Sequence, residues 1–121
     1  MTLKLSSTTE SEELHMTRLP THRPPTHPGE MLREEFLVPL GMTQTELAER
    51  IGVSYPRVNE IVNAKRGISP DTALRLSKLL GTTPEFWLDG QRNWDLWHAM
   101  HGPHSDDIDK IEPVAVHKYN D

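Results

Sequence analysis

Apolar side chains near the middle of the chain repeat with the spacing of two short helices. The first set is Leu47, Ala48 and Ile51, and the second is Val58, Ile61 and Val62. Gly52 separates the two sets where the chain must turn with a positive φ, which glycine adopts without strain. Thr43 and Ser54 precede the sets and are residue types that cap helix N-termini. The pattern predicts a helix over 44–51, a tight turn and a second helix over 55–62.

A similar pattern predicts a helix ahead of this pair, over residues 28–37. Leu32 and Phe36 form an apolar pair one helical turn apart. Pro39 and Gly41 are expected to end this helix, since proline removes a backbone donor and glycine favours the turn.

Two more helices are predicted after the pair. Ser69 is a suitable N-cap for a helix over 70–80, which Gly81 ends. Thr83 is a suitable N-cap for a helix over 84–100. Together the five segments predict an all-α fold.

The order of these segments divides the chain into one helical domain and two tails. Residues 1–26 are rich in Ser, Thr, Glu and Pro, which is typical of a flexible tail, although such a tail can also order on a protein partner. Residues 27–101 form the predicted domain, whose last helix serves the core or dimerisation. Residues 102–121 form an acidic tail, in which residues 111–116 are an edge strand or no strand because of Pro113.

The composition narrows the class of protein. The chain of 121 residues contains no cysteine, so neither a disulfide nor a thiolate zinc site can stabilise it. It has no apolar run of the roughly 20 residues that a membrane helix needs, and its first residues lack an apolar signal core. We therefore expect a cytoplasmic protein without a membrane partner.

The formal net charge of −5 by itself disfavours nucleic-acid binding. The charge is, however, unevenly distributed along the chain. Residues 28–80 carry seven basic and seven acidic side chains, whereas residues 81–121 carry three basic and eight acidic ones. The predicted helix pair lies in the neutral part, beside a local cluster of Arg57, Lys65 and Arg66. Because affinity for DNA depends on local phosphate contacts, this part can bind DNA, with a modest affinity per monomer that favours a dimer.

The helix pair resembles the helix-turn-helix of the phage-repressor (Xre-type) family, which places a small residue such as Ala48 where the two helices cross. Segments 27–36, 66–76 and 83–88 resemble the HigA antitoxin group, also known as the virulence-associated protein I group. The resemblance covers roughly residues 27–100. It implies a five-helix, lambda-repressor-like helix-turn-helix domain with flexible N- and C-terminal tails.

The resemblance also implies a function: a sequence-specific DNA-binding repressor that is the antitoxin of a HigBA-type module. Such a protein neutralises an RNA-cleaving toxin and represses its own operon. The implied partners are double-stranded DNA with a palindromic operator, a second copy of the chain as a homodimer, and a protein toxin; no cofactor is implied. Two alternatives are a stand-alone Xre-type regulator without a toxin, and a protein-interaction module that has lost DNA binding.

In helix-turn-helix proteins the second helix lies in the major groove, with its N-terminal residues at the base edges. By resemblance, Arg57 and Asn59 are the expected base readers, because a guanidinium can pair with guanine and an amide with adenine. Ser54 and Tyr55 are expected at the groove edge, on backbone or base. The expected phosphate contacts are Gln44, Asn63, Lys65 and Arg66. The alternatives are that Tyr55 packs over the core, and that Arg57 and Asn59 are ordinary solvated side chains.

The last predicted helix is rich in tryptophan and histidine. Trp87, Trp94 and Trp97 either complete the core of the monomer or contribute to a homodimer interface. His98, His101 and His104 recur every three residues, a spacing that can bind zinc or nickel from one helix face. Because Gly102 and Pro103 break the helix before the third histidine, we expect a solvated helix end and no metal site.

The chain shows none of the common catalytic signatures. It has no Gly-rich phosphate loop, no nucleophile elbow and no His-Glu zinc motif. We therefore expect no enzymatic activity.

Overall fold

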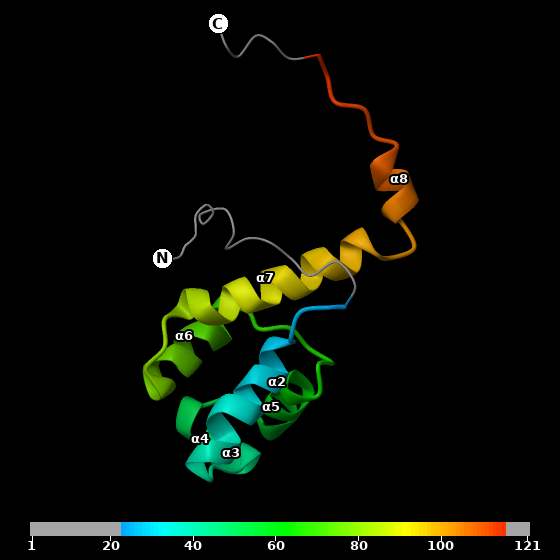
Figure 1. Cartoon of the computed structure of the whole chain (residues 1–121). Coiled ribbons are helices and arrows are strands. Elements are labelled where there is room, and N and C mark those ends of the chain that lie inside the picture. Colours follow the sequence, from blue (N-terminus) through cyan, green and yellow to red (C-terminus); the bar gives the residue numbers. More distant parts are fainter. Residues whose placement is uncertain (1–22, 116–121) are drawn as a thin grey trace, which may run out of the picture.

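The computed structural model describes residues 23–115, and every regular element within that range is a helix. The elements are α2 (Pro28–Leu32), the π-helical turn η1 (Arg33–Leu37), α3 (Val38–Leu40), α4 (Gln44–Ile51), α5 (Tyr55–Val62), α6 (Pro70–Leu80), α7 (Pro84–Met100) and α8 (Ser105–Asp109). α7 lies across the bundle formed by the preceding helices, and α8 projects beyond it (Figure 1). None of the described helices has the length and apolar character needed to cross a bilayer. The predicted tail 1–26 lies mostly outside the described residues.

The first predicted helix is longer than expected. α2, η1 and α3 follow one another without a break over residues 28–40, so the prediction that Pro39 ends this helix is wrong. The Val38 N–H donates to the carbonyl of Arg33, five residues back, in a wide π-helical turn. This turn gives room where proline lacks an N–H and its ring would press on the preceding turn. Gly41, with φ of 65°, ends the helix as predicted.

The helix-turn-helix forms as predicted, with α4 and α5 joined at Gly52. The Thr43 hydroxyl accepts from the Glu46 N–H at 3.0 Å and begins α4. The Ser54 hydroxyl accepts from the Arg57 N–H at 3.2 Å and begins α5. Gly52 has φ of 74°, the left-handed conformation that the turn requires.

The core lies where α2, α4, α5, α6 and α7 meet. All six apolar residues that predicted the helix pair are buried in it, and Trp87 is 0% exposed. The indole Nε1–H of Trp87 donates to the Thr82 hydroxyl at 2.7 Å, so its one polar atom is satisfied. The other buried apolar residues are Leu32, Leu37, Ile68, Ala73 and Leu76.

α6 fixes the end of α4 as well as contributing to the core. Ser69 caps α6 and Gly81 ends it, as predicted. Nη1 of Arg75 donates to the carbonyls of Ile51 at 2.7 Å and Gly52 at 3.4 Å. The guanidinium therefore satisfies carbonyls that the end of α4 leaves without a helical partner.

α8 was not predicted, because residues 102–121 were expected to form an acidic tail. Asp106 and Asp107 lie in the first turn of α8, where negative charge is favourable. A helix of five residues is too short to show a hydrophobic period. The following residues 111–115 form no strand.

Candidate DNA-binding surface

Four of the predicted site residues form one polar network at the exposed side of α5. Nδ2 of Asn59 donates to Oε1 of Gln44 at 3.0 Å, across from α5 to the start of α4. The same nitrogen lies 3.4 Å from the hydroxyl oxygen of Tyr55, one turn earlier in α5. Nδ2 of Asn63 donates to the backbone carbonyl of Asn59 at 2.9 Å. The network holds these amides in fixed positions on the surface.

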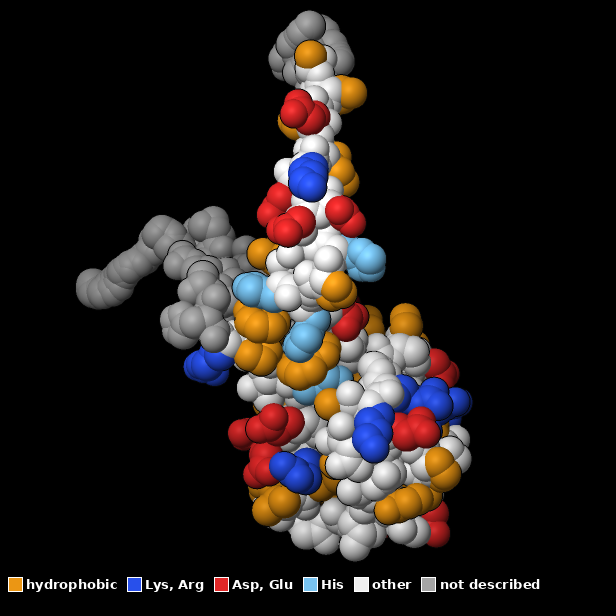
Figure 2. All heavy atoms as spheres, turned by 90° about the vertical axis from the view of Figure 1, so that its right-hand side faces the viewer, with side chains coloured by type: hydrophobic (Ala, Val, Ile, Leu, Met, Phe, Trp, Pro, Cys, Tyr) orange, Lys and Arg blue, Asp and Glu red, His pale blue; other side chains and the backbone are white. Residues whose placement is uncertain are grey.

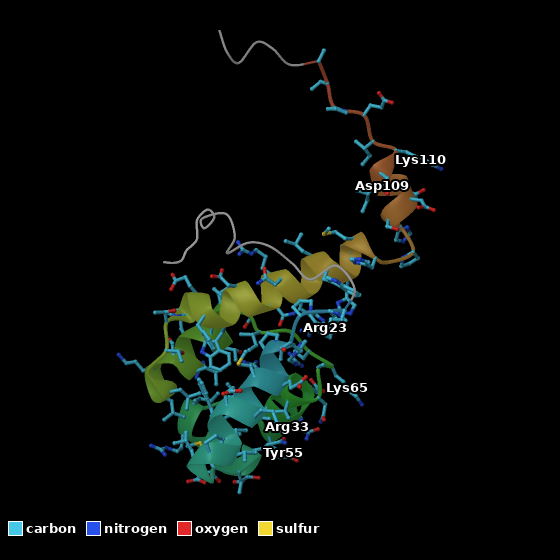
Figure 3. The ribbon with its side chains drawn as sticks, in the orientation of Figure 1. Arg23, Arg33, Tyr55, Lys65, Asp109 and Lys110 are labelled. Carbon is cyan, nitrogen blue, oxygen red and sulfur yellow. The ribbon has the colours of Figure 1, made fainter. Side chains whose placement is uncertain are left out.

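Tyr55 belongs to this surface and not to the core. It is 47% exposed and lies on the outside of the body (Figure 3). Ser54, directly before it, is also exposed, and its hydroxyl is engaged as the cap of α5. The first turn of α5 is therefore open to an approaching ligand.

The two expected base readers point to different sides of α5. Residues two positions apart on a helix do not face each other. Asn59 faces the start of α4, whereas Nη1 of Arg57 lies 3.8 Å from Oδ2 of Asp71 in α6. The same carboxylate oxygen accepts from Nε of Arg75 at 2.9 Å. Arg57 is thus at the α6 edge of the surface, separate from the polar network.

The basic loop after α5 contains one paired and one unpaired cation. Nε of Arg66 donates to Oε1 of Glu60 at 2.8 Å, and both side chains are exposed. Lys65 is exposed, projects from the loop (Figure 3) and has no ion pair among the described residues. Ala64 has φ of 59°, a left-handed conformation that redirects the chain before Lys65. Basic and acidic side chains are mixed over the face shown in Figure 2, which places no broad basic patch there.

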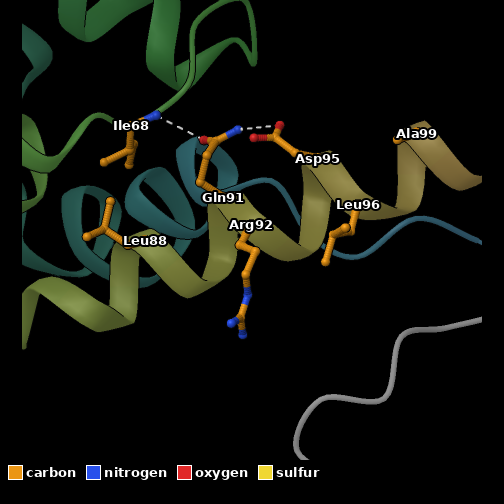
Figure 4. Close-up of a pocket in the computed structure, with 7 residues that line it drawn as sticks. All are labelled: Ile68, Leu88, Gln91, Arg92, Asp95, Leu96 and Ala99. Carbon is orange, nitrogen blue, oxygen red and sulfur yellow. Dashed lines mark hydrogen bonds between the residues drawn. The ribbon is translucent and has the colours of Figure 1, made fainter. Parts of the chain in front are cut away.

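Gln91 of α7 anchors this loop, a role that the sequence analysis missed. Its Oε1 accepts from the Ile68 N–H at 2.9 Å, and its Nε2 donates to Oδ1 of Asp95 at 3.0 Å (Figure 4). A β-carbon at Gly67 would lie 3.0 Å from the Gln91 amide, so glycine lets the loop approach α7 closely. No local signal links residues this far apart in the chain.

Comparison with known proteins places this architecture in a family. The helix-turn-helix family profile matches residues 32–87. Virulence-associated protein I of Dichelobacter nodosus is 46% identical over 97 residues, 80% of this chain and 88% of that protein. Antitoxin HigA-1 of Vibrio cholerae is 46% identical over 96 residues, 79% of this chain and 90% of that protein. The structure of the Pseudomonas aeruginosa antitoxin HigA with the higBA promoter has a TM-score of 0.70 and 40% identity, covering 74% of this chain and 98% of that one. This chain belongs to the HigA family.

The tryptophans of this HigA-family protein divide between two roles. Trp87 is in the core, so the prediction that the tryptophans complete the monomer holds for this residue. Trp94 and Trp97 are partly buried on one face of α7. The Trp94 ring meets the ring of His27 edge-on at 4.9 Å, and the Trp97 ring stacks on His101 at 4.0 Å.

The opposite face of α7 is an open apolar groove. A groove of about 500 Å³ is lined by Ile68, Leu88, Gln91, Arg92, Asp95, Leu96 and Ala99 (Figure 4). A second groove, between α7 and α8, shares Leu96 and Ala99 with it and adds Met100 and Ile108. The apolar surface therefore continues from the body of this HigA-family protein to α8.

The three histidines at and after the end of α7 are engaged separately. Nδ1 of His98 lies 2.9 Å from the carbonyl of Trp94, and Nδ1 of His101 lies 2.8 Å from the carbonyl of Trp97. Nδ1 of His104 lies 3.7 Å from Oδ2 of Asp107. Across residues 23–115, no three His, Cys, Asp or Glu side chains come together as metal ligands.

A fourth histidine, His27, is a buried helix cap that the sequence analysis also missed. It is 3% exposed, and its Nδ1 accepts from the Gly29 N–H at 2.8 Å at the start of α2. Burial lowers the pKa of His27 below its ordinary value, and a smaller contribution from His98 lowers it further, while the charges of Asp95 and Glu30 oppose the shift. The imidazole is therefore held neutral, as an acceptor of the cap hydrogen bond must be.

Proposed function

We propose that this chain is a DNA-binding antitoxin that represses its own operon and neutralises a partner toxin. The observation that carries the proposal is the polar network of Gln44, Tyr55, Asn59 and Asn63 at the open start of α5, within a HigA-family fold. A helix-turn-helix presents this part of its second helix to the major groove. The network offers amide and hydroxyl groups there, which are the groups that read bases and bind phosphates.

The residues have distinct proposed roles on a duplex. Asn59 reads a base from the centre of the surface, and Gln44 binds a phosphate beside it. Lys65 binds a phosphate from the loop after α5. Arg57 contacts DNA at the α6 edge after leaving Asp71, a separation that costs little because the pair is long at 3.8 Å and partly exposed. Ser54, Asn63 and Arg66 supply the remaining contacts to the backbone.

The DNA-binding part is tested with the duplex that lies upstream of the gene for this chain. Fluorescence anisotropy at two salt concentrations should show specific binding that weakens as salt rises. Lys65→Ala should weaken binding to specific and unrelated duplexes alike and reduce the salt slope by about 1, whereas Asn59→Ala should weaken only the specific duplex. Equal affinity for specific and unrelated duplexes would leave the interaction-module alternative in place.

A homodimer is part of the proposal, with the apolar groove of α7 and α8 as its interface. Helix-turn-helix dimers bind two half-sites that lie one helical turn apart, roughly 34 Å. A second copy of the chain would bind the second half-site. The groove is apolar and open, and Arg92 and Asp95 place opposite charges on different sides of α7 at its lining (Figure 4). A two-fold contact can pair such charges between copies.

The antitoxin part is tested by the neighbouring gene. A small adjacent reading frame whose product arrests growth, and whose toxicity this chain suppresses on co-expression, would support it. Co-purification of the two products would show direct neutralisation. Growth arrest that persists despite co-expression, or the absence of such a gene, would favour the stand-alone regulator.

A further inference from the structure

The orientation of the Asn59 amide limits which bases it can read. Each side-chain amide has two N–H donors on nitrogen and one acceptor oxygen. Nδ2 of Asn59 is the donor in its bond to Oε1 of Gln44 at 3.0 Å, and it approaches the Tyr55 hydroxyl at 3.4 Å. The first N–H is thus engaged by Gln44, and the Tyr55 hydroxyl is a longer contact for the second. Among the described residues nothing donates to Oδ1 of Asn59, so the acceptor is what this side chain offers outward.

The chemistry of phosphate requires the same orientation. A phosphate only accepts hydrogen bonds, so Gln44 must turn Nε2 toward it. Oε1 of Gln44 then faces Asn59, whose Nδ2 is the donor to it. A Gln44 side chain that binds phosphate through Nε2 therefore also orients Asn59 so that its Oδ1 faces outward.

We propose that Asn59 reads an exocyclic amine, N6 of adenine or N4 of cytosine, through Oδ1. This inference rests on the proposed DNA-binding function and specifies its ligand. In the major groove only those two groups donate, whereas guanine N7 and O6 and thymine O4 accept. Adenine and cytosine are accepted at this position of the contacted strand, and guanine and thymine are rejected. A bidentate pairing with adenine N6 and N7 would require the second N–H to leave the Tyr55 hydroxyl, so the acceptor Oδ1 is the primary reading group.

The experiment uses the full chain and a duplex that it selects from a randomised pool. In each half-site, purine replaces adenine or 2-pyrimidinone replaces cytosine to remove the amine, and 7-deazaadenine removes N7. One position per half-site should lose about 5- to 100-fold in affinity without the amine. The same position should tolerate 7-deazaadenine wherever it holds adenine.

Two variants assign that position to Asn59. Asn59→Ala should no longer distinguish duplexes with and without the amine, although it still binds DNA. Asn59→Asp keeps the acceptor oxygens and should keep the dependence on the amine at a lower overall affinity. A dependence on N7 that Asn59→Ala removes, or a dependence on the amine that Asn59→Ala retains, would overturn the inference while leaving DNA binding intact. A chain that selects no duplex would instead overturn the proposed function, and this inference with it.

Discussion

Gly29 in α2 lies directly against the carbonyl oxygen of Ile61 in α5. A β-carbon at residue 29 would overlap that oxygen, so α2 can cross α5 at this distance only with glycine. We expect Gly29→Ala to lower the free energy of unfolding by about 2 kcal/mol or more, because one of the two backbones must move. Chemical denaturation measures the change.

Gly90 provides the matched control for this substitution. It also lies within a helix, but a β-carbon there would meet only Pro28, at an ordinary 3.6 Å. Gly90→Ala should therefore raise the free energy of unfolding by up to about 1 kcal/mol through helix propensity. Equal effects at the two positions would show that the crossing of α2 and α5 is not tight.

Arg75 is expected to stabilise the helix-turn-helix through the carbonyls of Ile51 and Gly52. Arg75→Ala should cost about 1 kcal/mol of unfolding free energy, which allows for the partial exposure of the guanidinium. Lys65→Ala removes an exposed charge and should change stability by less than about 0.5 kcal/mol. If Arg75→Ala lowers the melting temperature no more than Lys65→Ala does, Arg75 does not stabilise the helix-turn-helix.

Glu60 is expected to weaken DNA binding, because it pairs with Arg66 and repels phosphate. Glu60→Gln should raise affinity about threefold to tenfold at low salt and steepen the salt dependence, since Arg66 becomes available to a phosphate. Glu49→Gln changes the charge equally at an exposed position of α4 and leaves the pair of Glu60 with Arg66 in place. Titrations in which both variants gain equally would mean that only net charge matters.

Leu96 is expected to be central to the proposed dimer, because both apolar grooves include it. Leu96→Glu places a charge in this surface and should shift the chain to monomer in sedimentation at micromolar concentration. Leu74→Glu, on an exposed position of α6, is the control and should leave the assembly unchanged. A wild-type chain that sediments as a monomer would argue against the interface.

His27 is expected to make stability depend on pH. Its pKa is lower in the folded chain than the value of about 6.5 in the unfolded chain. The unfolded chain therefore binds more protons, and stability falls as pH drops from about 6.5 to the lowered pKa, below which this contribution levels off.

His27→Asn separates this effect from other titrations. Asparagine keeps an oxygen that can accept from the Gly29 N–H but does not titrate. Denaturation from pH 5 to 8 should give a smaller pH dependence for the variant than for the wild type. Parallel curves would assign the dependence to other groups.

The parts of the fold that local signals determine were predicted from the sequence. α4, α5, α6 and α7 begin after Thr43, Ser54, Ser69 and Thr83, whose hydroxyls each accept a backbone N–H at the helix start. Gly52 ends α4 with the predicted positive φ. Caps and turns act over a few residues, so one sequence suffices to find them.

The parts that depend on tertiary contacts were not predicted. Gln44 and Asn59 are 15 residues apart in the chain, and their shared hydrogen bond exists only after α4 and α5 pack. The burial of His27 depends on Trp94, far along the chain. The opposite directions of Arg57 and Asn59 did have a signal in the sequence, because residues two apart on a helix diverge. The DNA-contact roles of Gln44, Arg57 and Asn59 stay predictions.

The length of α7 carries a consequence for the spacing of the operator. Its 17 residues, Pro84–Met100, run about 25 Å, from the end that Trp87 fixes in the core to the apolar end proposed to contact the second copy. In such a dimer α7 sets both the distance between the two DNA-binding surfaces and their relative rotation. One residue inserted after Asp95, beyond the contacts that Gln91 and Trp94 make with the body, would rotate the far end by about 100°. The two DNA-binding surfaces would then no longer face the same side of the duplex.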